Sequence, residues 1–403
     1  MAASCHSCCA SCWQLDFGHS TFFVRSVPEA FKNLINPGTV REIGAQLARV
    51  WPGFDRQRFE RLALRSLETL EFKARAQHVC NALEATLPDD FERAAEMLEK
   101  SLAPVGTRRS TVAPDVPTDA GLNGWAVWPL GEYVARRGLE SPERALRTLH
   151  ALTQRFTAEW PVRAFIETHP ELTFATLAAW ARDPSEHVRR LASEGSRPRL
   201  PWGLQLKKLI ADPSPTLPLL RALQDDESDY VRRSVANHLN DIAKDHPAIV
   251  AEWLETYLPG ASPQRRALLR HASRTLIKRG DPRTLKAWGL GRKLRGEAGL
   301  KVTPKRVTIG DNIGLAVALK STARTSQKLV VDYAVHHVKA NGGTSAKVFK
   351  GWTLELGAGE ERLLHKRHSL KLITTRRYHA GRHVLDLLVN GEVVASAAFD
   401  LQL

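Results

Sequence analysis

The hexapeptide VRRLAS at residues 188–193 returns as VRRSVA at residues 231–236, 43 positions further along the chain. A weaker copy, LLRHAS at residues 268–273, follows 37 positions later, and LRTLHA at residues 146–151 precedes the first copy by 42. A period near 40 residues indicates units of paired helices that stack on one another, because one pair alone cannot bury its apolar face.

Prolines mark the starts of the predicted helices. Proline is tolerated at the first helical residue because its missing N–H has no partner inside the helix, and Ser or Asp before it is a good cap. Such pairs occur at Ser141-Pro142, His169-Pro170, Asp183-Pro184, Asp212-Pro213, His246-Pro247, Ser262-Pro263 and Asp281-Pro282. We therefore predict an all-α HEAT-like repeat solenoid over residues 28–290, with a concave surface.

The pattern changes at about Leu290. Residues 291–299 are rich in Gly, Lys and Arg and are predicted to be a linker that lets the last domain swing. Residues 300–403 alternate apolar and polar side chains, and Asn390-Gly391 is a typical hairpin turn. About seven strands without a helix predict an all-β immunoglobulin-like sandwich. The clearest strands are expected at 313–319, 329–338, 352–356 and 383–389.

Charge is the most informative property of the composition. The 58 Lys and Arg exceed the 43 Asp and Glu, which gives a net charge of +15 and a pI near 9.8. Residues 301–403 hold 16 of these basic and 8 of these acidic residues, a net charge of +8. Such an excess favours a polyanionic partner, with nucleic acid ahead of anionic membranes or ribosomes. A soluble basic protein without such a partner is the alternative.

Several classes of protein are disfavoured. The sequence lacks an apolar run of about 18 residues and a signal peptide, so we expect a cytoplasmic protein that makes no contact with a membrane. It also lacks GxGxxG, P-loop and HExxH motifs, so we expect neither nucleotide-driven chemistry nor a metal site on a helix.

Cysteines gather at the N-terminus, at Cys5, Cys8, Cys9 and Cys12. Their C-x-x-C spacing could chelate zinc, but no apolar frame surrounds them, and a structural zinc site organises a fold around itself. We expect residues 1–27 to be a disordered leader, or to result from a start codon assigned too far upstream. Cys80 lies in a helical pattern and is expected to be a reduced core thiol.

Pairs of arginines recur in the repeats, at Arg189-Arg190 and at Arg232-Arg233. Equivalent positions of stacked repeats share one surface, so the pairs are expected to form a basic stripe along a phosphate backbone. The alternative for one member of each pair is an ion pair with a preceding acid. The candidate acids are Asp183, Glu186, Asp226 and Asp229.

The passage that ends at Trp202 is the most unusual of the chain. Arg197-Pro198-Arg199 is incompatible with the interior of a helix, so these guanidinium groups are expected on a loop suited to phosphates. Trp202 either wedges against a base or closes the repeat.

Tryptophans and acids supply the candidate chemistry. Trp125 and Trp128 share a helical face, and Glu132 falls on that face too. A carboxylate beside an aromatic wall suits glycosidic hydrolysis, because the anion stabilises an oxocarbenium-like sugar while a ring holds a cationic base. Core packing of both indoles is the alternative.

A second candidate carboxylate follows on another predicted helix. Arg163 and Glu167 are four residues apart, so they form either an intrahelical ion pair or part of a site with the first carboxylate. Trp180, on the following helix, is expected to pack beside them.

Four long motifs resemble the AlkC branch of the DNA alkylation repair glycosylases. They are GLNGWAVWPLGEYV (121–134), RAFIETHPELTFATLAAWARD (163–183), VRRLASEGSRPRLPW (188–202) and YVRRSVANHLNDIAKDHP (230–247). The resemblance runs from about residue 28 to the end, and residues 1–27 have no counterpart in it. It implies a solenoid that grips duplex DNA and excises cationic N3-alkylated purines such as 3-methyladenine, without a metal or other cofactor.

The resemblance also implies roles for individual residues. Glu132 and Glu167 would act at the sugar of the lesion, with Arg163 and Trp180 beside them. Trp160 is given no role. The DNA backbone would be held by Arg189, Arg190, Arg199, Trp202, Arg232, Arg233, Asn237 and His238, beside Arg197 of the loop described above.

The sandwich is expected to close over the DNA as a clamp. Its charge is concentrated near strand ends and loops, at Arg376, Arg377 and Arg382 among others. Two rival hypotheses remain: a non-enzymatic scaffold that binds DNA by shape, which would not need the two carboxylates, and a protein-binding scaffold with an apolar concave face. We expect a monomer that acts on double-stranded DNA at the bacterial nucleoid.

Overall fold

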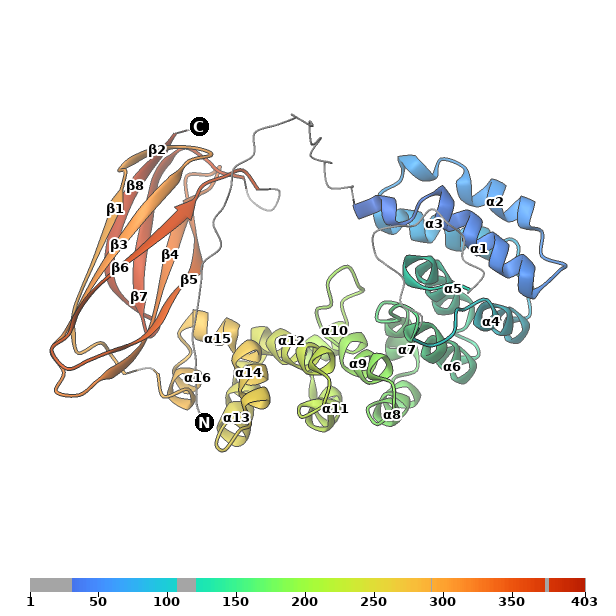
Figure 1. Cartoon of the computed structure of the whole chain (residues 1–403), viewed down its shortest axis with the longest axis horizontal. Coiled ribbons are helices and arrows are strands. Elements are labelled where there is room, and N and C mark those ends of the chain that lie inside the picture. The colour runs from blue at the N-terminus through green and yellow to red at the C-terminus, as the bar shows by residue number, and fades with distance from the viewer. Residues whose placement is uncertain (1–30, 107–120, 291, 374–376, 403) are drawn as a thin grey trace, which may run out of the picture.

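The computed structural model describes residues 31–106, 121–290, 292–373 and 377–402. Figure 1 shows the helices as a curved row, with a β-sandwich at one end and the first helices at the other. Both ends stand on the same side of the row, which gives the molecule a concave side. The predicted order, a helical repeat solenoid followed by an immunoglobulin-like sandwich, is confirmed.

Short helices make up the whole first part of the chain. They are α1 (Pro37–Val50), α2 (Arg56–Leu64), α3 (Phe72–Glu84), α4 (Phe91–Lys100), α5 (Trp128–Arg137), α6 (Pro142–Thr153), α7 (Val162–Thr168), α8 (Pro170–Trp180), α9 (Glu186–Gly195), α10 (Lys207–Ala211), α11 (Leu217–Leu223), α12 (Asp229–Asp245), α13 (Pro247–Tyr257), α14 (Pro263–Ala272), α15 (Arg274–Arg279) and α16 (Pro282–Ala287). Single 3-10 turns lie at Phe31–Leu34, Leu67–Thr69, Gly124–Val127 and Ser214–Thr216.

Five of the seven predicted proline starts are the first residues of α6, α8, α13, α14 and α16. The Asp183-Pro184 pair instead forms a turn, in which the Asp183 carboxylate accepts a hydrogen bond from the backbone N–H of Ser185, and α9 begins one residue later. Asp212-Pro213 forms a similar turn before a 3-10 helix. At both places the Asp side chain accepts a hydrogen bond from the backbone N–H two residues later, and this turn replaces the start of an α-helix.

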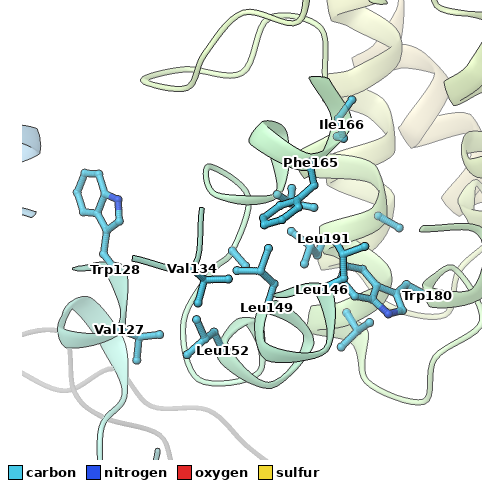
Figure 2. Close-up of a cluster of buried hydrophobic side chains, with 14 of the residues drawn as sticks. Val127, Trp128, Val134, Leu146, Leu149, Leu152, Phe165, Ile166, Trp180 and Leu191 are labelled. Carbon is cyan, nitrogen blue, oxygen red and sulfur yellow. The ribbon is translucent and has the colours of Figure 1, made fainter. Parts of the chain in front are cut away.

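One continuous apolar core runs through the solenoid. Figure 2 shows a part of it, where Leu146 and Leu149 of α6 meet Phe165 of α7 and Leu191 of α9. Cys80 lies in this core as a reduced thiol, and burial raises its pKa to about 12. The zinc hypothesis for the other cysteines, the leader 1–27 and Arg376 lie outside the described residues.

The sandwich has a three-stranded sheet in the order β1-β3-β6 and a five-stranded sheet in the order β2-β8-β7-β4-β5. Neighbouring strands are antiparallel except β2 and β8. Apolar side chains such as Val317 and Val331 fill the space between the sheets. The strands are β1 (Gly296–Thr303), β2 (Arg306–Thr308), β3 (Asn312–Ser321), β4 (Gln327–Val338), β5 (Thr344–Leu356), β6 (Glu361–Ser369), β7 (Gly381–Val389) and β8 (Glu392–Gln402).

The two domains are tied together, contrary to the expected swinging linker. Strand β1 begins at Gly296, inside the segment predicted to be a linker. The Asn390 amide donates to the carbonyl of Arg292 at 2.9 Å, and Gln327 exchanges two hydrogen bonds with the backbone of Arg295. A Cβ on Gly391 would come within 2.6 Å of the Gly280 Cα, so the hairpin turn and the end of α15 touch backbone to backbone.

Candidate functional site

Glu132 is half-buried on α5, one helical turn after Trp128. The indole Nε1 of Trp128 donates to its carboxylate at 3.0 Å, which confirms the shared face predicted from their spacing. Gly131 lets α5 approach α7 closely, because a Cβ there would lie 3.0 Å from the Cγ of Pro161. The carboxylate is thereby fixed at the junction between two repeats.

Aromatic rings gather beside this carboxylate. Trp128 stacks on Trp160 with ring centroids 4.6 Å apart, and Phe72 meets Trp128 edge-on at 5.0 Å. We define the aromatic cluster as Phe72, Trp125, Trp128, Phe156, Trp160 and Trp202. Trp128 is itself buried in the core, so its predicted contact with DNA is corrected to core packing, and Trp125 is half-buried against that core. The accessible π face of the cluster is that of Trp202, which can meet a cationic or aromatic ligand.

Trp160 lies at the centre of the aromatic cluster, although the sequence analysis gave it no role. A signal existed in the sequence: Trp160-Pro161 repeats the pair Trp128-Pro129, and both pairs stand at the start of a helix. Equivalent positions of neighbouring repeats meet in a solenoid, so two such pairs are expected to stack.

Glu167 is half-buried near the end of α7, one turn after Arg163. The two carboxylates therefore stand on the neighbouring helices α5 and α7, with Pro161 at the contact. Of the two, the Glu132 carboxylate contacts the aromatic cluster, through Trp128. A carboxylate in such a place can stabilise a cation or orient water.

Arg163 is corrected from a DNA contact to a structural side chain. It is fully buried and donates to the carbonyls of Gly195, Arg197 and Leu204 at 2.6 to 2.8 Å. Burial, followed by the nearby Arg197, lowers its pKa to about 10. A buried guanidinium needs acceptors, and the loop after α9 supplies them.

Trp180 lies away from Trp128, the partner of Glu132, contrary to expectation. It is buried, packs against the ring of His150 at 5.8 Å, and lines a separate cavity of about 500 Å³ between α6 and α8. Figure 2 draws Trp180 and Trp128 on opposite sides of the core.

The predicted basic stripe is corrected at its first arginine pair. Arg189 is buried and forms a bidentate ion pair with Asp226 of the next repeat, at 2.7 and 3.0 Å. Arg190 is largely covered by Tyr230 and pairs with Glu159 at 2.8 Å. These arginines join repeats, because a covered guanidinium without an acid would be costly.

Two further predicted DNA contacts are buried. Arg197 pairs with Glu194 and Asp241, so it is a core residue rather than a displayed one. His238 is fully buried with its Nδ1 on the carbonyl of Ser193, and burial lowers its pKa to about 3. The imidazole is neutral and out of reach of a phosphate.

The remaining predicted contacts stay at or near the surface. Arg199 pairs with Asp245 but keeps about a third of its side chain exposed, at 31%. Asn237 is half-buried and accepts from His271 and Arg274. Exposed side chains are found at Arg233, Trp202, Arg377 and Arg382.

Arg232 and Arg233 line a cavity of about 760 Å³ between α12, α14 and strands β4 and β5. The cavity also holds a buried carboxylate, Asp332, whose pKa burial raises. Its other basic side chains are Arg270, Arg274, Lys278 and Lys350. The sequence did not predict this cavity, because the cavity forms only where the two domains meet. Such a basic surface suits a phosphate backbone.

Curved helical repeats, a basic surface and carboxylates beside an aromatic cluster define a class of helical-repeat protein that acts on nucleic acid. The model of the DNA alkylation repair enzyme family matches residues 156–276, and a model for the C-terminal Ig-like domain of YhaZ matches residues 297–403. The chain is 35% identical to the uncharacterised protein YhaZ of Bacillus subtilis over 372 residues, which cover 92% of this chain and 99% of that one.

A solved structure extends the likeness to the whole fold. The alkylpurine DNA glycosylase AlkC of Pseudomonas fluorescens, bound to DNA containing an abasic site analog, is 38% identical with a TM-score of 0.84. The match covers 93% of this chain and all of that one. The chain belongs to the DNA alkylation repair enzyme family. Within the described residues, no helix is both long and apolar enough to cross a membrane.

Proposed function

We propose that this protein is an alkylpurine DNA glycosylase, which hydrolyses the bond between deoxyribose and a cationic alkylated purine such as 3-methyladenine in duplex DNA. The observation that carries the proposal is the carboxylate of Glu132, held by an indole N–H beside the aromatic cluster. The likeness to AlkC across 93% of the chain supports it.

The lesion itself makes the chemistry feasible. An alkylated purine is positively charged, so it leaves with the electrons of the glycosidic bond as a neutral base. The sugar carbon develops positive charge and takes a hydroxyl from water, whose proton passes to a carboxylate. The enzyme therefore gains most by stabilising the sugar cation and placing the water.

Glu132 and Glu167 are the proposed catalytic residues. The hydrogen bond from Trp128 fixes the orientation of the Glu132 carboxylate and leaves its second oxygen for the developing cation. Glu167 would place the water from the neighbouring helix. Rings of the aromatic cluster would hold the cationic base before the bond breaks.

The DNA backbone would be held by arginines of the solenoid and of the sandwich. Arg232 and Arg233 on α12 and Arg377 and Arg382 on the sandwich are the proposed contacts, with Arg199 beside them. Because the two domains are tied, these groups would meet the duplex as one surface. We propose a monomer that acts at the bacterial nucleoid.

The test is the release of free 3-methyladenine from a methylated duplex by the purified protein, in the presence of a chelator. Glu132→Gln and Glu167→Gln should each slow single-turnover release about a hundredfold while binding changes little, because a carboxylate that faces developing charge acts mainly in the transition state. Glu171→Gln, an exposed acid at the start of α8, is the matched control and should release base normally.

Tight binding without any release by the native protein would refute the enzyme and favour a scaffold. Normal release by the double variant of Glu132 and Glu167 would refute only the catalytic assignment.

A further inference from the structure

The loop between α9 and α10 carries two exposed large apolar side chains. Trp202 is 58% exposed and Leu204 is 59% exposed. The loop closes on itself through a hydrogen bond from the Leu206 N–H to the Pro198 carbonyl. In Figure 1 it extends beyond the row of helices at α10, on the concave side.

Trp202 has a left-handed backbone, with φ of 62°. A bulky residue rarely adopts this conformation, which costs on the order of 1 to 3 kcal/mol and clusters at functional sites. Glycine would adopt it without strain. Packing against Phe72 and Trp160 accounts for only part of the indole, which is 58% exposed.

The strain persists because the surroundings hold the loop in place. The Arg163 guanidinium donates to the carbonyls of Arg197 and Leu204, and the Trp160 indole donates to the carbonyl of Pro201 at 3.2 Å. Lys73 reaches the carbonyl of Trp202 itself at 3.3 Å. Both Arg163 and Glu167 are on α7, so one helix sets the positions of the loop and of a proposed catalytic carboxylate.

A chain of rings connects the loop to the other carboxylate. Trp202 stacks on Trp160 at 6.4 Å with planes 30° apart, and Trp160 stacks on Trp128, which donates to Glu132. The exposed indole is thus the outermost ring of the aromatic cluster. Its neighbours Lys207 and Lys208 are exposed cations suited to phosphates.

We propose that the Trp202 indole stacks on a base next to the alkylated base in bound duplex DNA and holds that base step open. This inference rests on the proposed function. Apolar wedges inserted between base steps unstack them and kink the duplex toward the major groove, which widens the minor-groove side where the sugar carbon under attack lies. An indole suits every sequence, because each base offers a π face.

The test uses Trp202→Gly, Trp202→Phe and the control Leu363→Ala, which trims an exposed side chain on β6. The first readout is 2-aminopurine fluorescence beside an abasic-site analogue in a duplex, which rises when the base unstacks. The second is the single-turnover rate of 3-methyladenine release, and the third is the thermal unfolding midpoint.

Trp202→Gly should unfold at the native temperature or above it, because the backbone strain is relieved. It should nevertheless lose the fluorescence rise and release base about tenfold more slowly, since one stacked base is lost. Trp202→Phe should keep most of both signals, and Leu363→Ala all of them.

A native fluorescence rise in Trp202→Gly overturns the wedge. A further variant, Trp202→Asn, also tolerates the left-handed backbone. The wedge is overturned as well if Trp202→Gly and Trp202→Asn both lose activity together with a lower unfolding midpoint. If the native protein releases no base, the proposed function fails. The fluorescence of the abasic duplex still shows whether Trp202 opens a base step or only packs against its own repeat.

Discussion

In the repeat that contains α9, Arg189 is buried and Arg190 largely covered, whereas in the repeat that contains α12 their counterparts Arg232 and Arg233 line a basic cavity. The two hexapeptides begin with the same three letters. Whether an arginine of this motif is buried or exposed therefore depends on residues outside the motif.

The neighbouring acids differ between the two repeats. Asp226 accepts the bidentate pair of Arg189, but when the third copy of the repeat is aligned with the second, Pro263 stands in the place of Asp226. Arg190 pairs with Glu159 and has Glu194 one turn further on, whereas Asn237 stands one turn after Arg233. Arg232 donates instead to the carbonyls of Asp226 and Glu227 and keeps 14% of its side chain exposed, while Arg233 is exposed.

The largest effect is expected from breaking the buried pair. Arg189→Ala leaves Asp226, whose side chain is only 6% exposed, as an unpaired charge, and should lower the free energy of unfolding by about 3 to 5 kcal/mol. Arg233→Ala, at an exposed position, should change it by less than about 0.5 kcal/mol. Urea denaturation measures both, and similar losses in the two variants would contradict the comparison.

A second difference concerns His238, which stands where the first repeat has Gly195. The pKa of His238 falls to about 3 in the folded chain, whereas in the unfolded chain it is about 6.5. The unfolded state therefore binds more protons below the unfolded pKa, so stability is lost as the pH falls. Between pH 6.5 and 5 the loss from this group should be about 2 kcal/mol.

Denaturation of His238→Gln over the same pH range provides the check. The variant should lose less stability on acidification than the native protein. Parallel curves for the two proteins would show that the imidazole does not titrate in this way.

The second arginine pair offers a test through binding. Replacing Arg232 and Arg233 by Ala should weaken binding to damaged and undamaged duplex equally, and reduce the salt dependence by about one unit of slope per lost contact. Fluorescence anisotropy at several salt concentrations measures this. A loss confined to damaged DNA would mean that the pair reads the lesion.

The smallest effect is expected when an acid is added to the second repeat. Asn237→Glu restores the acid that the second repeat lacks, one helical turn after Arg233. An ion pair at this spacing is worth a few tenths of a kcal/mol, so duplex binding should weaken about twofold. Asn237→Gln keeps the length without the charge and should bind as the native protein does.

Local sequence predicted most of the fold. The repeat period, the proline starts and the Asn390-Gly391 turn depend on neighbouring residues, and the structure confirms the two domains that they indicated. The shared face of Trp128 and Glu132 was likewise predictable, because one turn of helix fixes it. The catalytic roles of Glu132 and Glu167 stay predictions.

The partners of the arginines and of His238 could not be predicted, because they lie in other repeats. Asp226 is 37 residues from Arg189, and Asp241 is 44 from Arg197. Which of several acids meets an arginine depends on how far one repeat is rotated against the next, and no local pattern records that rotation. Trp160 was missed for the same reason, since its stacking partner belongs to the preceding repeat.

The tie between the domains has a topological consequence. Gly280 and Gly391 meet without side chains, and Asn390 fastens the segment between the domains, so the sandwich stands beside the solenoid before any DNA arrives. Because the sandwich and the first helices stand on one side of the row of helices, the residues that the structure describes form an arc with an open side. An arc of this shape admits a duplex from the side, without threading a free end through a ring.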